Sequence, residues 1–180
     1  MGTVYNENGN VNEYTYMRDI IQVYHPEYAA ESDERKEKQL ERASKGHFTT
    51  SFILEETFSM YSKSLGDQFT LIPSNATGED FKDGSDLKTC SITLRSDGLW
   101  KGDISGLKNK KGALRVIIYN GITQELEYYF LPYPDWQVLL NNPDSANAKI
   151  ALSATPNKKG VIDRLQPYRC IDFTSLVIKK

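Results

Sequence analysis

Acidic side chains and a lysine gather in one short stretch, residues 78–89, with the sequence GEDFKDGSDLKT. Asp86 and Lys88 stand two positions apart at the start of a segment that predicts a strand, so both side chains point to the same face. Burying an acid and a lysine there is unfavourable unless other charges balance them. A divalent cation bound through oxygen ligands would do so. The stretch therefore indicates metal-assisted phosphodiester hydrolysis, in which Lys88 stabilises charge or orients the attacking water.

A Mg²⁺ site of this kind needs at least one more carboxylate, and the sequence offers several. Two acids precede the turn before Asp86, and two glutamates lie in a segment predicted as an amphipathic helix that can lie beside the strand. The candidate metal ligands are Asp80, Asp83, Asp86 and Glu55, and the candidate catalytic residues are Asp80, Asp86, Lys88 and Glu56.

The same triplet also has a purely structural interpretation. An isolated Asp-x-Lys triplet commonly forms a surface salt bridge. The chain would then be a non-catalytic DNA- or protein-binding module, for example one encoded by a phage. A phage structural or inhibitor protein is a further alternative, and the acidic pI of about 5.8 is compatible with it. The position of the triplet at a strand start, with acids directly upstream, favours the metal site.

Composition excludes several other classes. Hydrophobic residues make up 39% of the 180 positions, which is enough for a core, and the formal net charge of -2 is unlike that of a protein that only coats nucleic acid. Cys90 and Cys170 form no CxxC pair, which argues against a zinc ribbon or a disulfide scaffold. His25 and His47 are too few for an HNH-type site. The polar start and the absence of a long apolar run predict a cytoplasmic protein without a membrane partner.

The order of predicted elements indicates the fold class. Residues 1–45 are predicted as a helical N-terminal extension, and a further helix begins at Thr49 or Thr50 and ends near Ser64. Predicted strands cover residues 68–73, 85–94, 113–119, 126–131, 149–153, 169–173 and 176–178, with a short helix from Asp135 to Leu140. Asn120-Gly121 predicts the hairpin turn after the most apolar strand. We expect an α/β fold, more closely an α+β mixed sheet flanked by helices, in one domain spanning residues 1–180.

The acidic stretch resembles the metal site of PD-(D/E)xK nucleases, in particular small type II restriction endonucleases. In that pattern an Asp is followed by a short hairpin and then by (D/E)-x-K on the next strand. By this resemblance Asp80 is the first acid, Asp86 the second and Lys88 the lysine. The likeness covers roughly residues 50–155 and includes the VIIYNG strand end, a Trp-containing helix and the Asn147–Ile150 step.

The chain also departs from the family pattern. No proline precedes the first acid, the spacing from Asp80 to Asp86 is short, and Asp86 replaces the more frequent Glu. Asp83 and Asp67 therefore remain alternatives for the first acid. The resemblance implies a restriction-endonuclease-like three-layer core, a Mg²⁺ cofactor and cleavage of double-stranded DNA that leaves a 5′-phosphate. It also implies a homodimer that cuts both strands of a palindrome, in the cytoplasm of a bacterial or phage-infected cell.

Contacts to DNA phosphates need clustered Lys and Arg side chains. One Lys-rich loop follows the predicted metal-site strand and another lies near the C-terminus. The candidate DNA-binding residues in and around them are Arg95, Asn109, Lys110, Lys111, Lys158 and Lys159. Loops of this composition are also typical of plain solvated surface.

Overall fold

In a computed structural model the chain divides into two compact units, residues 1–74 and 75–180. The structure describes residues 58, 62, 79–123, 125–154 and 161–179. In the first unit Phe58 and Ser62 are helical, and the Ser62 hydroxyl donates to the Phe58 carbonyl over 2.8 Å, which agrees with the helix predicted there. The other elements predicted before residue 79 lie outside the described residues. So do Glu55, Glu56 and Asp67.

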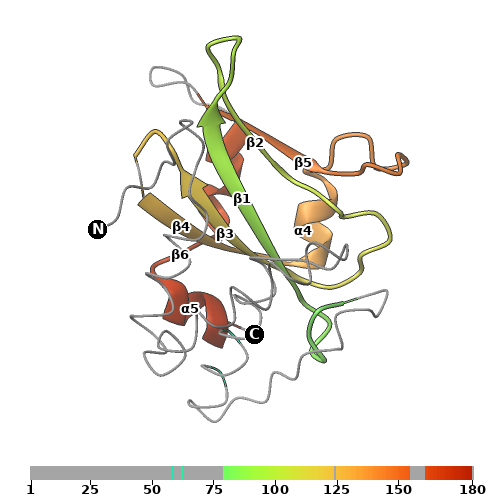
Figure 1. Cartoon of the computed structure of the whole chain (residues 1–180). Helices are drawn as coiled ribbons and strands as arrows, with labels where there is room; N and C mark the ends of the chain where they lie inside the picture. Colours follow the sequence, from blue (N-terminus) through green and yellow to red (C-terminus); the bar gives the residue numbers. More distant parts are fainter. Residues whose placement is uncertain (1–57, 59–61, 63–78, 124, 155–160, 180) are drawn as a thin grey trace, which may run out of the picture. The chain divides into compact units, whose positions relative to one another are not determined.

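The described part of the second unit contains a six-stranded mixed sheet and three short helical segments (Figure 1). In chain order the elements are β1 (Asp86–Leu94), β2 (Trp100–Ile104), β3 (Leu114–Asn120), β4 (Glu125–Leu131), α4 (Tyr133–Gln137), β5 (Ile150–Ala154), the 3₁₀ helix η1 (Val161–Tyr168), β6 (Arg169–Cys170) and α5 (Phe173–Ile178). The predicted α+β class, a mixed sheet with flanking helices, is confirmed at this level.

The strand that carries Asp86 lies inside the sheet, whose order is β5-β2-β1-β3-β4-β6. β2 pairs with β1 antiparallel, and β3 pairs with β1 parallel over seven positions, from Asp86 opposite Leu114 to Ile92 opposite Asn120. The amino ends of β1 and β3 therefore lie side by side. The chain must return from β2 to this same end of the sheet before β3 can begin.

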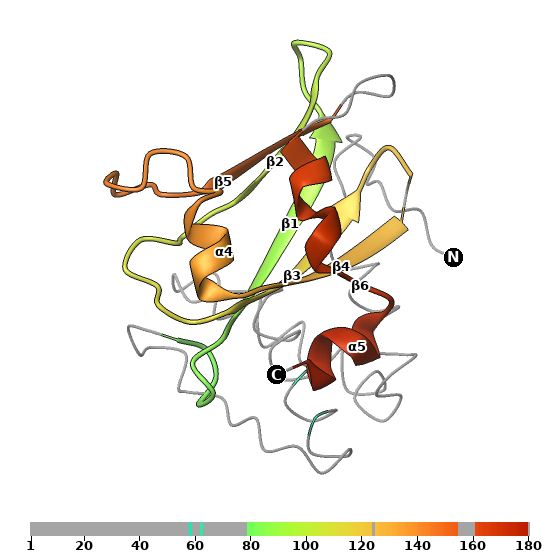
Figure 2. The same ribbon diagram turned by 180° about the vertical axis from the view of Figure 1, so that it is seen from behind.

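Both faces of the sheet are covered, which explains why every residue of β3 is buried. Val116 and Ile118 belong to a core that also contains Trp136 of α4 and Leu165 of η1. The next side chain along, Arg115, points to the opposite face, where it donates to carbonyls of α5. Figure 2 shows η1 and α4 on the face that is turned away from the viewer in Figure 1. The apolar core therefore lies between this face of the sheet and the helical segments η1 and α4.

Strands were predicted best where apolar runs are long. The strands predicted at residues 85–94, 113–119, 126–131 and 149–153 are observed, with ends shifted by at most one residue. β2 was missed because Gly102 and Asp103 are poor strand formers. Gly102 is required by packing: a Cβ at this position would lie 2.6 Å from the carbonyl oxygen of Ser91 on β1.

Two predictions near chain turns were wrong. The short helix begins at Tyr133, not after a cap at Asp135, because Pro134 is compatible with a first helical turn. Residues 176–178, predicted as a strand, form the end of α5. Asp172 caps that helix, since its carboxylate accepts from the Ser175 amide over 2.7 Å. The strand predicted at residues 169–173 is therefore reduced to the two residues of β6.

No helix among the described residues combines the length and apolar character that crossing a membrane requires.

Candidate functional site

The chain enters β1 through a tight acidic turn, residues 80–85. The Phe81 amide donates to the Ser85 carbonyl over 3.1 Å, and the Gly84 amide donates to the Phe81 carbonyl over 3.0 Å. Gly84 has a φ of 87°, a conformation that favours glycine. The Phe81 side chain is fully buried and anchors the turn. These contacts fix where the acids of the turn lie relative to Asp86.

The two upstream acids have different surroundings. Asp80 accepts one hydrogen bond, from the Leu87 amide over 2.9 Å, which holds its carboxylate beside the first residues of β1. Asp83 uses both carboxylate oxygens within the protein. Its Oδ1 accepts from the amide and hydroxyl of Ser85, over 2.9 and 2.6 Å, and its Oδ2 pairs with Arg115 over 3.3 Å. Asp80 is therefore the upstream acid with more capacity left for a ligand.

Asp86 has a completely buried side chain with only one of its two oxygens satisfied. Oδ1 lies 2.6 Å from the ammonium of Lys110, whereas Oδ2 has no hydrogen-bond partner in the structure. Burial raises the pKa of the Asp86 carboxyl, and the nearby negative charge of Asp80 adds to this. The Lys110 hydrogen bond and the charges of Lys110 and Lys88 lower that pKa, but burial is the largest effect. An unpaired buried carboxylate oxygen is uncommon in proteins and calls for an explanation.

Lys110 reaches Asp86 from a second segment, the lysine loop, residues 105–113. The Asp86 amide donates to the Ala113 carbonyl over 3.0 Å, so the loop ends directly beside β1. A Cβ at Gly112 would lie 1.4 Å from the Gly84 carbonyl oxygen, which shows how closely the loop backbone packs on the acidic turn. At the other end of the loop, a Cβ at Gly106 would lie 3.4 Å from the Lys88 ammonium. Lys110 therefore lies in this loop, and the ammonium of Lys88 lies beside it.

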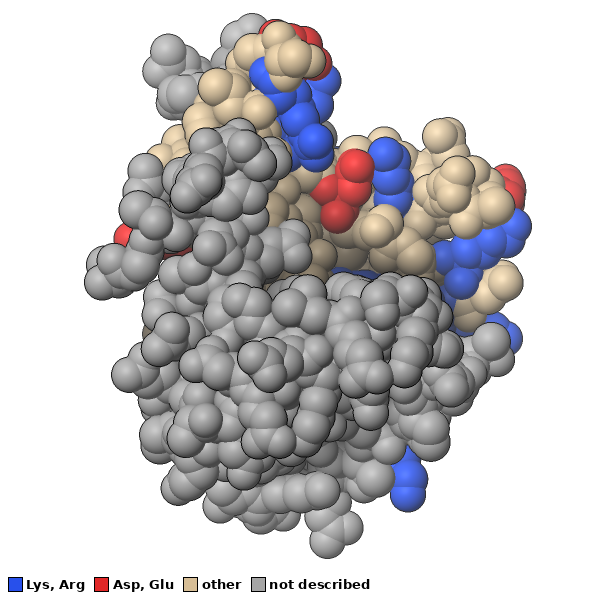
Figure 3. All heavy atoms as spheres, viewed as in Figure 1, with Lys and Arg blue, Asp and Glu red and all other residues tan. Residues whose placement is uncertain are grey.

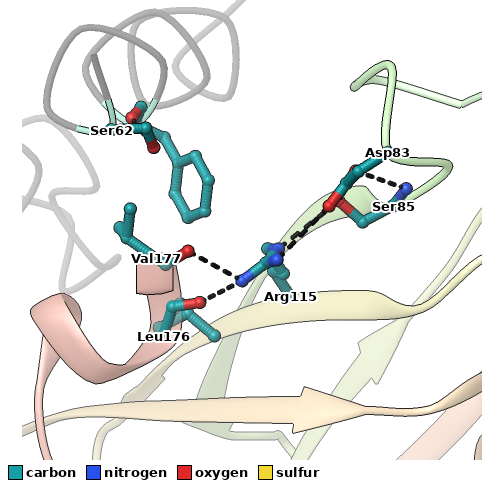
Figure 4. Close-up of polar contacts among 7 residues, drawn as sticks. Ser62, Asp83, Ser85, Arg115, Leu176 and Val177 are labelled. Carbon is teal, nitrogen blue, oxygen red and sulfur yellow. Dashed lines mark hydrogen bonds and ion pairs between the residues drawn. The ribbon is translucent and has the colours of Figure 1, made fainter. Parts of the chain in front are cut away.

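Arg115 connects the acidic turn to the C-terminal helix. Its guanidinium, 1% exposed, donates to the carbonyls of Leu176 and Val177 in the last turn of α5 and pairs with Asp83 (Figure 4). The guanidinium carbon also lies 5.0 Å from the centre of the Phe130 ring. Arg115 thus holds Asp83 in place from the side opposite the strand face that carries Asp86.

The structure brings together some of the predicted site residues and separates others. Asp80, Asp86, Lys88 and Lys110 lie at one end of β1. Asn109 and Lys111 are exposed in the lysine loop. Arg95 follows the opposite end of β1, roughly 30 Å from Asp86 at about 3.3 Å per residue. Figure 3, drawn in the view of Figure 1, shows the Lys and Arg side chains of the described residues in separate groups. Lys158 and Lys159 lie outside the described residues.

Sequence reasoning assigned Lys110 to DNA contacts and did not connect it with Asp86, 24 positions away. It also overlooked Arg115. A signal for Arg115 was present, since this is the one charged residue inside the apolar run ALRVIIY. A charged residue in a strand that is buried on both faces needs a partner.

The residues present fit a Mg²⁺ site in which few ligands come from the protein and the others are water molecules. No group of three His, Cys, Asp or Glu side chains is arranged to hold a metal in the part of the chain that the structure describes. Asp80 and Asp86 offer two carboxylates, one with an unsatisfied buried oxygen. Mg²⁺ is typically held by one or two carboxylates together with several waters. The donor set therefore matches Mg²⁺ and would not hold a tetrahedral Zn²⁺.

No protein-family model, curated protein or solved structure matches this chain.

Proposed function

We propose that this protein is a Mg²⁺-dependent endonuclease that hydrolyses phosphodiester bonds of double-stranded DNA. A sequence-specific type II restriction enzyme with a restriction-endonuclease-like core is the form we favour. The observation that carries the proposal is the buried Asp86 carboxylate, which keeps one oxygen unpaired beside Asp80 and two lysines. The Lys110 ion pair accounts for one Asp86 oxygen and leaves the other, Oδ2, without a partner.

The roles of the residues follow from their positions. Asp80 and Asp86 would hold the Mg²⁺ ion, which when bound supplies charge neutralisation at the phosphoryl oxygens and a more acidic water. Lys88 lies on the same face of β1 as Asp86 and pairs with no carboxylate among the described residues, so its ammonium is available to a phosphate or to the attacking water. The exposed Asn109 and Lys111 would contact the DNA backbone or base edges. A symmetric homodimer would place one such site on each strand.

The first experiment incubates the purified protein with plasmid and phage DNA in Mg²⁺ or in EDTA. Asp86→Asn is compared with Asp97→Asn, which removes an exposed acid beyond the far end of β1. We expect discrete Mg²⁺-dependent fragments from the wild type and from Asp97→Asn. Asp86→Asn should reduce the cleavage rate by about 100-fold or more, because it removes a charge that the transition state requires.

Lys88→Met and Lys101→Met form a second matched pair, since Lys101 is an exposed lysine that pairs with Asp97. We expect a loss of about 100-fold for Lys88→Met and none for Lys101→Met. If diverse methylated and unmethylated DNA stays intact with Mg²⁺ and with Mn²⁺, the nuclease proposal is wrong.

One observation favours a second candidate function. The Lys110–Asp86 ion pair, 2.6 Å long, is itself a plausible structural pair, as expected for a non-catalytic DNA- or protein-binding module. Such a module would bind its partner equally well in EDTA and in Mg²⁺. Asp86→Asn would then reduce stability equally in EDTA and in Mg²⁺. No property of the protein would depend on the metal.

A further inference from the structure

The ion pair between Lys110 and Asp86 is shielded from water. The ammonium and Oδ1 are 2.6 Å apart, the Asp86 side chain is 0% exposed and the Lys110 side chain is 17% exposed. Water therefore screens this pair weakly, and the attraction is stronger than that of exposed pairs such as Lys101 with Asp97. Separating Lys110 from Asp86 without a replacement cation would leave a buried carboxylate uncompensated.

The Lys110 ammonium also occupies a position beside Asp86 that a bound metal ion and its water ligands would need. Oδ1 and Oδ2 are the only oxygens that Asp86 can offer to a cation, and the lysine holds the first of them. Because Asp80 already raises the negative charge around Asp86, this position attracts any cation that can reach it. One ammonium and one hydrated Mg²⁺ cannot both contact the same carboxylate at full strength, since like charges repel.

The backbone of the lysine loop is anchored on both sides of Asn109, next to Lys110. Leu107 is buried and its amide donates to the Ala148 carbonyl over 3.2 Å, while the Lys110 amide donates to the Leu107 carbonyl over 3.3 Å. Asn109 between them has a φ of 64°, which turns the chain back toward Asp86. Lys110 also lines a surface cavity of about 230 Å³, together with Lys108, Lys111 and Tyr133. An open space therefore adjoins Lys110 on the surface of the loop.

We propose that Lys110 is an internal counter-ion that competes with the divalent cation for Asp86, so that loading the metal requires Lys110 to leave the carboxylate. This inference rests on the proposed function, because it takes Asp86 as a metal ligand. Lys110 keeps the buried acid compensated in the metal-free protein and makes metal binding weaker than the two carboxylates alone would give. A DNA phosphate in the neighbouring cavity would attract the displaced ammonium, so that DNA and metal would each strengthen the binding of the other.

The test measures Ca²⁺ and Mg²⁺ affinity of the EDTA-stripped full chain by titration calorimetry, without DNA. Lys110→Gln removes the competing charge and should bind the cation about tenfold or more tightly than the wild type, as expected for loss of one charge-assisted hydrogen bond. Lys110→Arg keeps a positive charge and should bind no more tightly than the wild type. Lys101→Gln, which removes an exposed lysine elsewhere, should leave the affinity unchanged.

Thermal unfolding supplies a readout that does not depend on activity. Lys110→Gln should lower the unfolding midpoint in EDTA, and saturating Ca²⁺ should raise the midpoint more in this variant than in the wild type. The double variant Lys110→Gln with Asp86→Asn lacks both charges. It should unfold in EDTA at a higher temperature than Lys110→Gln and should bind no cation at this position.

The outcomes separate this inference from the proposed function. A folded Lys110→Gln variant that binds the cation no more tightly than the wild type would overturn the competition. If Asp86→Asn then abolishes binding, the metal site itself still stands. Absence of Ca²⁺ and Mg²⁺ binding in both the wild type and Lys110→Gln would overturn the metal site and the competition together.

Discussion

Asp86 and Lys88 share one face of β1 because alternate side chains of a strand point the same way, and their spacing alone predicts this. The cation that contacts Asp86 is a different residue, Lys110, which approaches from a loop 24 positions later in the chain. A carboxylate with one satisfied and one unsatisfied oxygen results from this arrangement. At the residue scale, the site therefore combines two side chains that share one strand face with one contact between distant segments.

A second buried acid shows what a fully satisfied carboxylate looks like in this protein. Glu127 on β4 is 5% exposed and accepts from the Asn120 amide group over 2.8 Å and from the Tyr129 hydroxyl over 3.0 Å. Its Oε1 also lies 3.2 Å from Arg169. Both oxygens have partners, so we assign Glu127 a structural role and expect no ligand there. The contrast with Asp86 is what makes Asp86 the candidate for binding a cation.

The same network predicts a pH dependence of stability. Burial raises the pKa of Tyr129, and the charge of Glu127 raises it further. The folded protein therefore keeps the Tyr129 proton above pH 10, where the unfolded chain loses it. Stability from this group is complete below about pH 10 and is lost as the pH rises toward the folded pKa. Urea unfolding between pH 8 and pH 11 should show this decline in the wild type.

Tyr129→Phe should remove the alkaline decline while reducing stability near pH 8 by about 1 kcal/mol, the usual contribution of one hydrogen bond. Tyr133→Phe, at an exposed tyrosine, is the matched control and should follow the wild type at every pH. An alkaline decline of the same size in Tyr129→Phe would show that other groups cause it.

At the scale of elements, the site exists because two connecting segments pack on each other. The acidic turn and the lysine loop lie side by side since β1 and β3 run parallel and begin at the same end of the sheet. Gly112 makes the close approach possible, and its carbonyl also accepts from the Trp136 indole over 3.0 Å. That hydrogen bond attaches the lysine loop to α4 and helps to position the loop that carries Lys110 beside Asp86.

Gly112→Ala should therefore separate the two segments. The added methyl would collide with the Gly84 carbonyl, a backbone atom that no rotamer change can move away. We expect a loss of about 3 kcal/mol in unfolding free energy, measured by urea denaturation. Gly98→Ala is the control, because Gly98 has a φ of 77° but nothing within 4 Å of its Cβ position. It should lose only about 1 kcal/mol from backbone strain. Equal losses in the two variants would contradict the close approach.

At the scale of the whole second unit, one side chain connects segments near the start and the end of its described residues. Arg115 lies 32 positions from Asp83 and 62 from Val177, and it binds both. The face of the sheet that carries Arg115 is therefore held together by charge and hydrogen bonds. The opposite face, with Val116, Ile118 and Trp136, is held together by apolar packing. The acidic turn depends on the first of these faces for its position.

Arg115→Met should destabilise the protein by about 3 to 5 kcal/mol, because Asp83 and two helix carbonyls would lose a buried donor. Arg164→Met, at an exposed position of η1, should change stability by less than about 0.5 kcal/mol. Chemical denaturation monitored by tryptophan fluorescence measures both. Arg115→Lys should also be destabilised, since a single ammonium cannot replace the forked donors of the guanidinium. A loss below about 1 kcal/mol in Arg115→Met would show that the connection contributes little.

The sequence by itself determined the strands that have strong local signals. The apolar run of β3 and the return strand β4 were predictable because each depends on neighbours within a few residues. The hairpin between them is observed, but its turn lies later than predicted, since Asn120 is the last residue of β3 and pairs with Glu125. The shared face of Asp86 and Lys88 follows from the same local period. Residues 176–178 were mistaken for a strand because an apolar run of that length carries no period, and only the Asp172 cap distinguishes a helix.

The tertiary structure alone decided which strands are neighbours and what surrounds Asp86. The parallel pairing of β1 with β3, the return of the lysine loop to the acidic turn and the partners of Arg115 all join residues 24 to 62 positions apart. No local pattern encodes such contacts, because they arise when the whole chain buries its apolar faces and must then compensate the charges enclosed with them.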